Sequence, residues 1–239
     1  MATYKSYQGH HLLSRGLFWG KLTGFWHKEI SFDLIHKFFY NFWWAPWRIV
    51  LIFFLRLQVD SKEDLKKLKG PLIVVANHMC WADPFIIGAS FPFLAKIFPI
   101  RYACLWKYFY VPFFLPFVWA FGSFPVWRGV GLSRALRKPL KILEKGGVVG
   151  IFPEGKRRWK KGFRRPKRGA AFMAIKTGTK ILPVKIEAPA KMKLSKILLR
   201  KYKVRVKIGI PFNLTPQPTE PPEFLNQPAN YIMQKVDGL

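Results

Sequence analysis

The sequence predicts an α/β domain in which helices flank a layered, mostly parallel sheet. The run at 71–76 is apolar and rich in β-branched residues, which is typical of a strand buried on both faces, and 147–152 predicts another buried strand. A further strand is expected at 181–186. Segments 132–145 and 169–177 carry leucines at helical spacing or a series of small residues, and both lie between these strands. Strands that alternate with helices along a chain favour a parallel sheet covered by helices.

Other elements are expected from weaker patterns. Segment 61–69 is polar and Lys-rich, which predicts a surface helix, and 84–96 predicts a helix that begins after Asp83. Pro139 should kink or split the helix of 132–145. Two further strands are expected at 122–126 and 204–210, and a short helix is expected at 231–236.

The chain is expected to have three parts. Residues 1–57 are rich in aromatic and basic side chains and predict membrane-anchoring helices, amphipathic at first and more apolar from 38 to 55. Pro46 and Arg48 lie within that apolar stretch, so a dipping or re-entrant helical pair is favoured over a clean span. Residues 58–211 form the α/β domain, and 212–239 form a Pro-rich tail.

The charge of the chain indicates a polyanionic partner. Its 41 Lys and Arg against 12 Asp and Glu give a net charge of +29, which suits nucleic acid, anionic lipid headgroups or a phosphorylated substrate. Aromatic residues make up 17% of the chain, and many Trp and Phe stand beside Lys and Arg, as at membrane interfaces. We therefore expect an anionic phospholipid membrane as partner and no nucleic acid.

The expected location is the cytoplasmic face of a membrane. The two cysteines, Cys80 and Cys104, form neither a disulfide framework nor a metal-ligand spacing, so a reducing compartment and no metal site are expected. The N-terminus lacks the apolar core and cleavage site of a signal peptide. Segment 108–127 is uncharged and long enough to span, but its prolines favour an apolar cap or acyl-binding wall that folds back.

The strand at 71–76 ends in a candidate catalytic pair. Asn77 and His78 follow it directly, and Asp83 comes five residues after the histidine. A histidine at the carboxyl end of a buried strand can take a proton from a hydroxyl while a carboxylate fixes its tautomer. The pair alone is weak, because a histidine and an acid at some fixed spacing also arise by chance. Asp83 before Pro84 is also explained as a helix N-cap.

Three more segments follow the pair in order. They are a strand that leads to Arg128 and Gly129, the tetrapeptide at 152–155 (Phe-Pro-Glu-Gly), and the run at 181–184 (Ile-Leu-Pro-Val). With the His-x4-Asp spacing they resemble the glycerolipid acyltransferase family, most closely the 1-acyl-sn-glycerol-3-phosphate (lysophosphatidate) acyltransferases. The resemblance extends from about residue 65 to about residue 211. The family's fold is an α/β domain with an N-terminal membrane-associated helical pair.

The resemblance implies a role for each matching residue. His78 is the general base and Asp83 its partner, with Asn77 beside them among the substrate-binding residues. Arg128 and Arg157 supply forked cationic groups for the acceptor's phosphate. Glu154 and Gly155 form a second acceptor-binding motif, in which Glu154 orients an arginine or accepts a glycerol hydroxyl. The remaining implied residue, Pro183, shapes the acyl-donor side.

The expected reaction moves a fatty acyl group from an acyl thioester to the free hydroxyl of lysophosphatidate, giving phosphatidate. The thioester of coenzyme A or acyl carrier protein is a co-substrate, and no cofactor is expected. Lys156 and Arg158 stand where many members have Thr and Ser, so another acceptor stays open: glycerol-phosphate, another lysophospholipid or an amino-lipid. A non-catalytic basic membrane or nucleic-acid binder is the other alternative. An acyl-cysteine at Cys80 is disfavoured, because a buried thiol is usually inert.

Overall fold

We describe a computed structural model of the chain, which defines the positions of residues 29–105, 118, 122–126, 132–155, 165–189, 192–214 and 225–239. Its contacts divide the chain into two compact units, Met1–Ile35 and His36–Leu239. The expected divisions at 57/58 and 211/212 therefore differ from the division that the contacts make. Segment 36–57 and the C-terminal segment belong to the same unit as the sheet, because their buried side chains complete its core.

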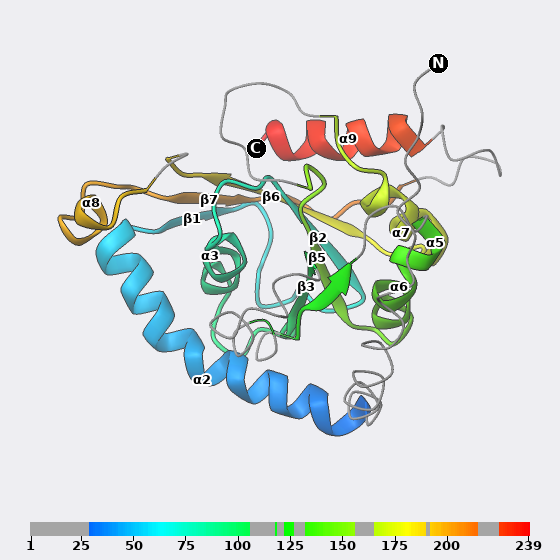
Figure 1. Cartoon of the computed structure of the whole chain (residues 1–239), viewed down its shortest axis with the longest axis horizontal. Helices are drawn as coiled ribbons and strands as arrows, with labels where there is room; N and C mark the ends of the chain where they lie inside the picture. Colours follow the sequence, from blue (N-terminus) through cyan, green and yellow to red (C-terminus); the bar gives the residue numbers. More distant parts are fainter. Residues whose placement is uncertain are drawn as a thin grey trace, which may run out of the picture. The chain divides into compact units, whose positions relative to one another are not determined.

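A sheet of seven strands forms the centre of the described part of the second unit, in the order β1-β7-β6-β2-β5-β3-β4 (Figure 1). All neighbouring strands are parallel except the pair of β6 and β7. The fold class predicted from the sequence is confirmed. The strands are β1 (Gln58–Ser61), β2 (Leu72–Ala76), β3 (Ile100–Leu105), β4 (Phe124–Val126), β5 (Val148–Ile151), β6 (Ile181–Glu187) and β7 (Arg205–Ile208).

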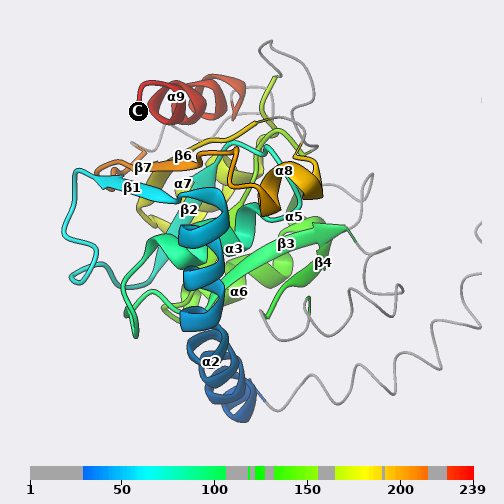
Figure 2. The same ribbon diagram turned by 90° about the vertical axis from the view of Figure 1, so that its left-hand side faces the viewer.

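Helices cover both faces of this sheet (Figures 1 and 2). Helices α2 and α3 pack on one face, and α6, α7 and α9 pack on the other. The described helices are α2 (Glu29–Leu55), α3 (Asp83–Ser90), α5 (Leu132–Ala135), α6 (Arg137–Glu144), α7 (Gly169–Thr177), α8 (Leu194–Leu198) and α9 (Asn226–Asp237).

The central strand β2 shows why the sheet needs a cover on both sides. All five of its residues are buried. Val74 and Ala76 enter the core under α3, whereas Ile73 and Val75 enter the core under α7 and α9. Alternate side chains of a strand point to opposite faces, so a continuous apolar run is stable only between two layers of helices. Each large apolar side chain buried in this way contributes about 1.5–3 kcal/mol.

Several predicted elements are confirmed. The helix expected at 132–145 is split into α5 and α6, and Pro139 lies in the first turn of α6, where its missing N–H removes no helical hydrogen bond. Helix α7 spans the nine residues predicted. Helix α9 is longer than the predicted 231–236, because Ala229 and its neighbours extend the buried stripe toward the N-terminus.

Other predictions were wrong at the level of single elements. The helix expected at 61–69 is replaced by β1 and a turn, in which the Ser61 hydroxyl and the Asp64 carboxylate bond nearby backbone groups. The helix expected to reach residue 96 ends at Ser90, because Phe91 precedes a proline and takes an extended conformation. Strands β1 and β3 were not predicted.

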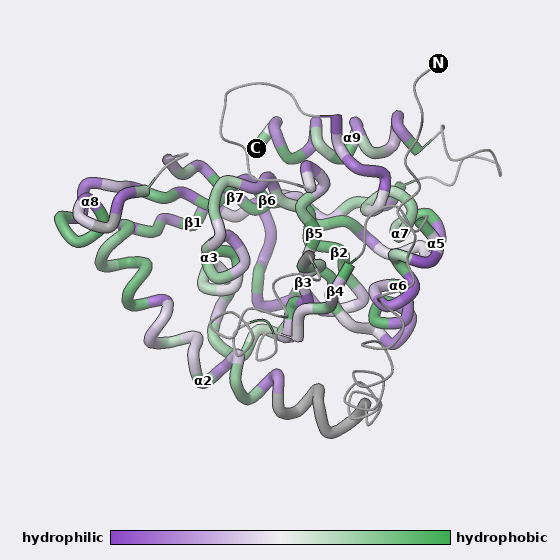
Figure 3. Tube along the Cα trace, viewed as in Figure 1, coloured by the Kyte–Doolittle hydropathy of each residue, from purple (hydrophilic) through white to green (hydrophobic). Residues whose placement is uncertain are grey.

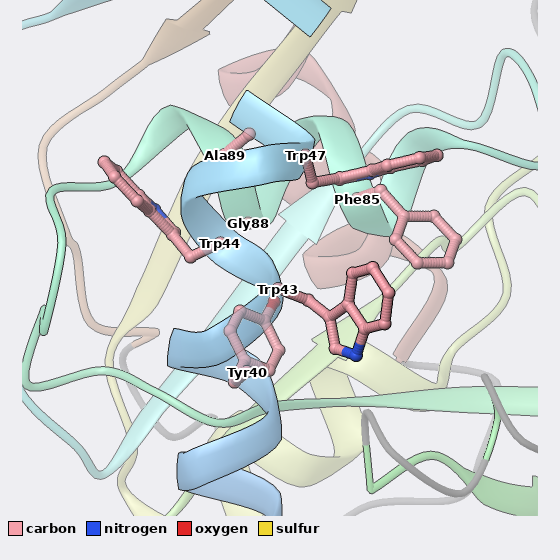
Figure 4. A pocket seen from close by; sticks show the side chains of 7 residues that line it. All are labelled: Tyr40, Trp43, Trp44, Trp47, Phe85, Gly88 and Ala89. Carbon is pink, nitrogen blue, oxygen red and sulfur yellow. The ribbon is translucent and has the colours of Figure 1, made fainter. Parts of the chain in front are cut away.

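Helix α2 packs on α3 through an aromatic face. The Trp44 indole N–H donates to the Phe91 carbonyl at 3.0 Å, and the Arg48 guanidinium donates to the carbonyls of Ala89 and Phe91. Figure 4 shows Tyr40, Trp44 and other aromatic rings of α2 around a cavity of about 10 Å³ against α3, which is roughly the space of one water. The rings therefore pack closely at this place, whereas a larger cavity of about 340 Å³ is lined by Trp44 and Arg48 of α2 together with Leu65 and Ser90.

The opposite face of α2 carries apolar side chains that nothing in the described part of the chain covers. The helix runs without a break through Pro46, so the expected re-entrant pair is not formed within 29–55. His36–Leu55 is the one described helix long and apolar enough to cross a membrane, with a mean hydropathy of 1.3. Figure 3 shows hydrophobic residues recurring along it. The amphipathic segment expected before residue 29 lies outside the described residues.

Candidate active site

His78 and Asp83 meet in the turn that follows β2. The His78 Nδ1 atom lies 2.7 Å from the Asp83 Oδ2 atom. The Asp83 side chain is fully buried, whereas the His78 side chain is 20% exposed. A carboxylate only accepts hydrogen bonds, so the short contact places the ring proton on Nδ1 and leaves Nε2 to take a proton from a substrate. The pairing predicted from the sequence is therefore present in the structure.

The Asp83 carboxylate is held by the turn itself. Its Oδ2 atom also accepts the backbone N–H groups of Met79 at 2.6 Å and Cys80 at 2.9 Å. The N-cap position of α3 belongs to Ala82 and carries no side-chain cap, so the predicted N-cap role of Asp83 was wrong. The carboxylate points back into the loop, where several donors compensate for the cost of burying its charge.

The Cys80 thiol belongs to the same arrangement. Its Sγ atom donates to the Asp83 Oδ1 atom at 3.1 Å. Burial, followed by the charge of Asp83, raises the pKa of Cys80 far above its ordinary value. A thiol held in its protonated form is a poor nucleophile. The geometry therefore agrees with the prediction that Cys80 forms no acyl intermediate.

The ring of His78 is stacked on Phe152, which directly follows β5. The two centroids are 4.4 Å apart, with an angle of 19° between the planes. Phe152 stacks in turn with Tyr102 of β3, at 5.6 Å. Gly150 makes room for this stack, because a Cβ atom there would lie 2.2 Å from the Tyr102 ring. The stack fixes the plane of the imidazole, a function of Phe152 that was not recognised from the sequence.

Glu154 and Gly155 complete the site from the turn after β5. Glu154 is 3% exposed, and its Oε1 atom accepts the backbone N–H of His78 at 3.3 Å. Gly155 has a φ of +64°, which favours glycine, and its N–H closes the turn on the Phe152 carbonyl at 3.0 Å. Strands β2 and β5 are parallel neighbours, so both turns lie at the same edge of the sheet. The structure thus brings together the first and third predicted motifs.

Two predicted substrate-binding residues lie within the sheet. The Asn77 side-chain amide donates to the Ile186 carbonyl at 2.8 Å and accepts the Ile186 N–H at 2.7 Å. These two bonds tie the end of β2 to β6. Pro183 pairs with Val75 in the sheet, and its ring lies beside Gly209. Contacts of Asn77 and Pro183 with a substrate stay predictions.

The remaining predicted site residues lie outside the described part of the chain. These are Arg128 and Arg157, together with most of the expected apolar cap at 108–121. The described residues alone supply a base, a buried carboxylate that orients it, and a turn that holds its backbone. Such an arrangement can deprotonate a hydroxyl at the edge of the sheet.

The chain is similar to known acyltransferases. It is 35% identical over 136 residues to a 1-acyl-sn-glycerol-3-phosphate acyltransferase of Borreliella burgdorferi, covering 54% of this chain and 50% of that protein. It is 26% identical over 191 residues to the enzyme of that name from Bacillus subtilis, covering 77% and 91%. A chloroplastic relative, LPAT1 of Arabidopsis thaliana, is 27% identical over 173 residues, covering 68% and 45%. The chain spans about half the length of several of these relatives.

A solved structure supports the fold. The crystal structure of the 1-acyl-sn-glycerophosphate (LPA) acyltransferase PlsC from Thermotoga maritima matches with a TM-score of 0.58 and 22% identity, over 92% of this chain and 88% of that one. A family model described as Acyltransferase matches residues 56–187, which include both turns of the site. Since this match covers more than half of its residues, the chain belongs to the acyltransferase family.

Proposed function

We propose that the chain transfers a fatty acyl group from an acyl thioester to the free hydroxyl of lysophosphatidate, giving phosphatidate. The observation that carries the proposal is the contact of His78 Nδ1 with the buried Asp83 carboxylate, which leaves Nε2 as a base. The relatives named as 1-acyl-sn-glycerol-3-phosphate acyltransferases support the choice of acceptor.

In the proposed reaction, His78 takes the hydroxyl proton while the hydroxyl oxygen attacks the thioester carbonyl. The carbon–sulfur bond then breaks, and the proton passes from the imidazolium to the leaving thiolate. Asp83 stabilises the imidazolium between these steps, and its bonds to Met79 and Cys80 keep it in place. No covalent enzyme intermediate and no cofactor are required. Holding the two substrates together would supply about 7–11 kcal/mol of the barrier reduction.

The acceptor's phosphate is proposed to bind Arg128 and Arg157. In sequence, Arg128 follows β4 and Arg157 follows β5, and these strands are linked through β3 as parallel neighbours. Their carboxyl ends therefore lie at the edge where His78 emerges. A guanidinium can hold a phosphate with two parallel hydrogen bonds, which would fix the distance from phosphate to hydroxyl.

Lipid contact is proposed for the uncovered face of α2. Between Asp33 and Asp60 the sequence has no acidic residue, while Lys37 and Arg56, near the two ends of the apolar stretch, are basic and exposed. An apolar face with basic flanks suits the surface of an anionic phospholipid membrane, here on its cytoplasmic side. The same aromatic and apolar character makes nucleic acid an unsuitable partner.

The test is acyl transfer from acyl-coenzyme A to lysophosphatidate in detergent, with wild type and His78→Ala in parallel. We expect turnover by wild type and a loss of about 10²-fold or more in the variant, because a general base contributes about that factor. Equal thermal unfolding of the two proteins would show that the loss is chemical. Equal turnover by a folded His78→Ala protein would overturn the mechanism.

The identity of donor and acceptor is tested with the same assay. Acyl carrier protein replaces coenzyme A in one series, and glycerol-phosphate, other lysophospholipids and an amino-lipid replace lysophosphatidate in another. We expect the highest kcat/KM with lysophosphatidate. A wild-type protein that binds vesicles yet acylates no acceptor in either series would instead favour a non-catalytic membrane binder.

A further inference from the structure

Helix α8 and the turn after it present an unusual surface on the face of the sheet that α2 covers. We call residues 196–201 the α8 tip. Leu198 and Leu199 are 58% and 65% exposed, although two neighbouring leucines would ordinarily be buried. Ile197 points the other way and packs on the core. Figure 3 shows hydrophobic and hydrophilic residues side by side in this region.

The α8 tip is attached to the C-terminal part of α2. The Arg200 guanidinium lies over the Phe53 ring at 4.5 Å and donates from Nε to the Phe53 carbonyl at 3.0 Å. Arg200 has a φ of +54°, which a non-glycine residue rarely adopts, and its own N–H is bonded to the Ile197 carbonyl. The contact with Phe53 and this local bond hold the turn in one shape, in which both leucines are exposed. Figure 1 shows α8 beside the C-terminal end of α2.

This attachment makes one surface out of two segments that are far apart in sequence. Phe53 is itself 51% exposed and belongs to a stripe on α2 that also contains Phe42, Ile49 and Ile52. Phe42 and Ile49 are seven residues apart, and Ile52 and Phe53 follow Ile49 by three and four residues, so all four lie on one side of the helix. The two leucines of the α8 tip therefore extend the uncovered apolar stripe beyond the end of α2.

The charge around the α8 tip has a single sign. Between Glu187 and Glu220 the sequence has eight Lys and Arg residues and no acidic residue. Lys196 and Lys201 are exposed, and no acidic side chain among the described residues pairs with them. Exposed leucines between lysines are the composition of an interfacial lipid contact, because the leucines enter the acyl boundary while the ammonium groups meet anionic headgroups.

We propose that the α8 tip is a second lipid contact, which inserts Leu198 and Leu199 into an anionic bilayer beside α2. Two separated contacts on one rigid unit fix its tilt on the membrane, which a single helix does not. The inference rests on the lipid contact of α2 in the proposed function, but not on acyl transfer, and it is tested by binding alone. Failure of the enzymatic assay would leave it standing.

The first experiment measures how deeply residue 199 of the α8 tip enters the bilayer. A fluorophore is attached to Leu199→Cys in the full chain with Cys104→Ser in the background, and the Cys104→Ser protein alone controls for labelling of the buried Cys80. A matched label is placed at Tyr231→Cys, since Tyr231 is also exposed and lies on α9, on the opposite face of the sheet. In vesicles of phosphatidylcholine and phosphatidylglycerol with nitroxide-labelled lipids, we expect strong quenching at 199 and none at 231.

The second experiment measures how much the two lysines of the α8 tip contribute to vesicle binding. We expect Lys196→Gln/Lys201→Gln to weaken binding to the anionic vesicles about 25-fold, or about fivefold for each lysine. The binding of this double variant to pure phosphatidylcholine vesicles should equal that of wild type. The control variant Lys235→Gln, on α9, should bind both the anionic and the phosphatidylcholine vesicles as wild type does. Equal quenching at 199 and 231 in vesicle-bound protein would overturn the proposal. So would a blue shift in the emission of the label at 199 that grows with protein concentration in the absence of vesicles, which would indicate a second copy of the chain as the partner.

Discussion

The two turns at the edge of the sheet differ in what they supply. The turn after β2 provides the reacting imidazole and the carboxylate beside it, and all bonds to Asp83 come from residues within five positions. The turn after β5 provides no base for the reaction, yet Phe152 stacks on the His78 ring and Glu154 accepts the His78 N–H. The first turn is self-contained, in that its own residues bond the Asp83 carboxylate. The second turn contacts the first through Glu154, which is 76 residues from His78 in the sequence.

This difference separates chemistry from positioning. Changes in the first turn should remove a charge or a proton acceptor and affect the rate strongly. Changes in the second turn should loosen the geometry of a base that is still present, with smaller effects on rate. The following predictions test that division.

The largest effect is expected for Asp83→Asn. An amide can keep the shape of the turn, but it carries no charge to stabilise the imidazolium, so kcat should fall about 10²–10⁴-fold. Steady-state kinetics on the purified variant measure this loss. Asp60→Asn is the matched control, because Asp60 is an exposed carboxylate paired with Arg205 at 3.4 Å, and it should retain full turnover. A loss of less than threefold in Asp83→Asn would remove the carboxylate from the mechanism.

A smaller effect is expected for Phe152→Leu. An aromatic pair contributes about 0.5–1.5 kcal/mol, so kcat should fall by up to about tenfold, with little change in KM. Phe152→Tyr should restore the rate, since it keeps the ring. A purely structural role would instead lower the melting temperature and leave the kcat of the folded protein unchanged.

Tyr102, which stacks with Phe152, provides the control. Its hydroxyl is buried without a hydrogen-bond partner among the described residues, and burial raises the pKa of Tyr102 well above its usual value, so the group stays neutral. Tyr102→Phe keeps the ring and removes the hydroxyl. Its free energy of unfolding should be unchanged or higher by about 1 kcal/mol, and its kcat unchanged.

Two glycines with positive φ give a matched comparison of strain. Among the described residues, a Cβ atom at Gly155 (φ +64°) would meet the Lys167 side chain at 3.5 Å, and one at Gly146 (φ +79°) would meet nothing within 4 Å. Each Gly→Ala change should therefore cost about 1–2 kcal/mol of stability from backbone strain alone. Only Gly155→Ala should also lower kcat, by a few-fold, because it moves Glu154. Equal kcat values in the two folded variants would contradict a positioning role for this turn.

The self-contained turn could be predicted from the sequence, and the contacts between turns could not. His78 and Asp83 are five residues apart, so a local pattern was enough to pair them. The Glu154 contact depends on the register of β2 with β5, and the Asn77 contact with Ile186 joins residues 109 positions apart. Residue types alone do not specify such pairings, so the bonds of Asn77 to β6 were not predicted from the sequence.

The same difference between local pattern and tertiary pairing explains which strands were predicted from the sequence and which were not. Strands β2 and β5 have continuous apolar sequences, and β6 is apolar and buried over residues 181–184, its first four. Strand β1 is short and mostly exposed, and β3 carries Arg101, so neither has an apolar pattern of its own. Both exist because a neighbouring strand, β7 or β5, offers them a hydrogen-bonding edge. Tertiary pairing of this kind overrides local propensity.

The smallest effect on kcat among changes in the first turn is expected for Cys80→Ala, which tests whether the thiol takes part in the reaction. Its backbone N–H still donates to Asp83, and only the weak thiol donor is lost, so kcat should fall less than about threefold.

Because the pKa of Cys80 is raised far above its ordinary value, the thiolate stays scarce from pH 6 to pH 9, and alkylation should remain slow throughout that range. Mass spectrometry after timed treatment with iodoacetamide measures this directly, with Cys104 in the same chain as the internal comparison. Rapid labelling of Cys80 together with loss of turnover in Cys80→Ala would instead make the thiol a nucleophile, and the chemistry of the first turn would then no longer rest on His78 and Asp83 alone.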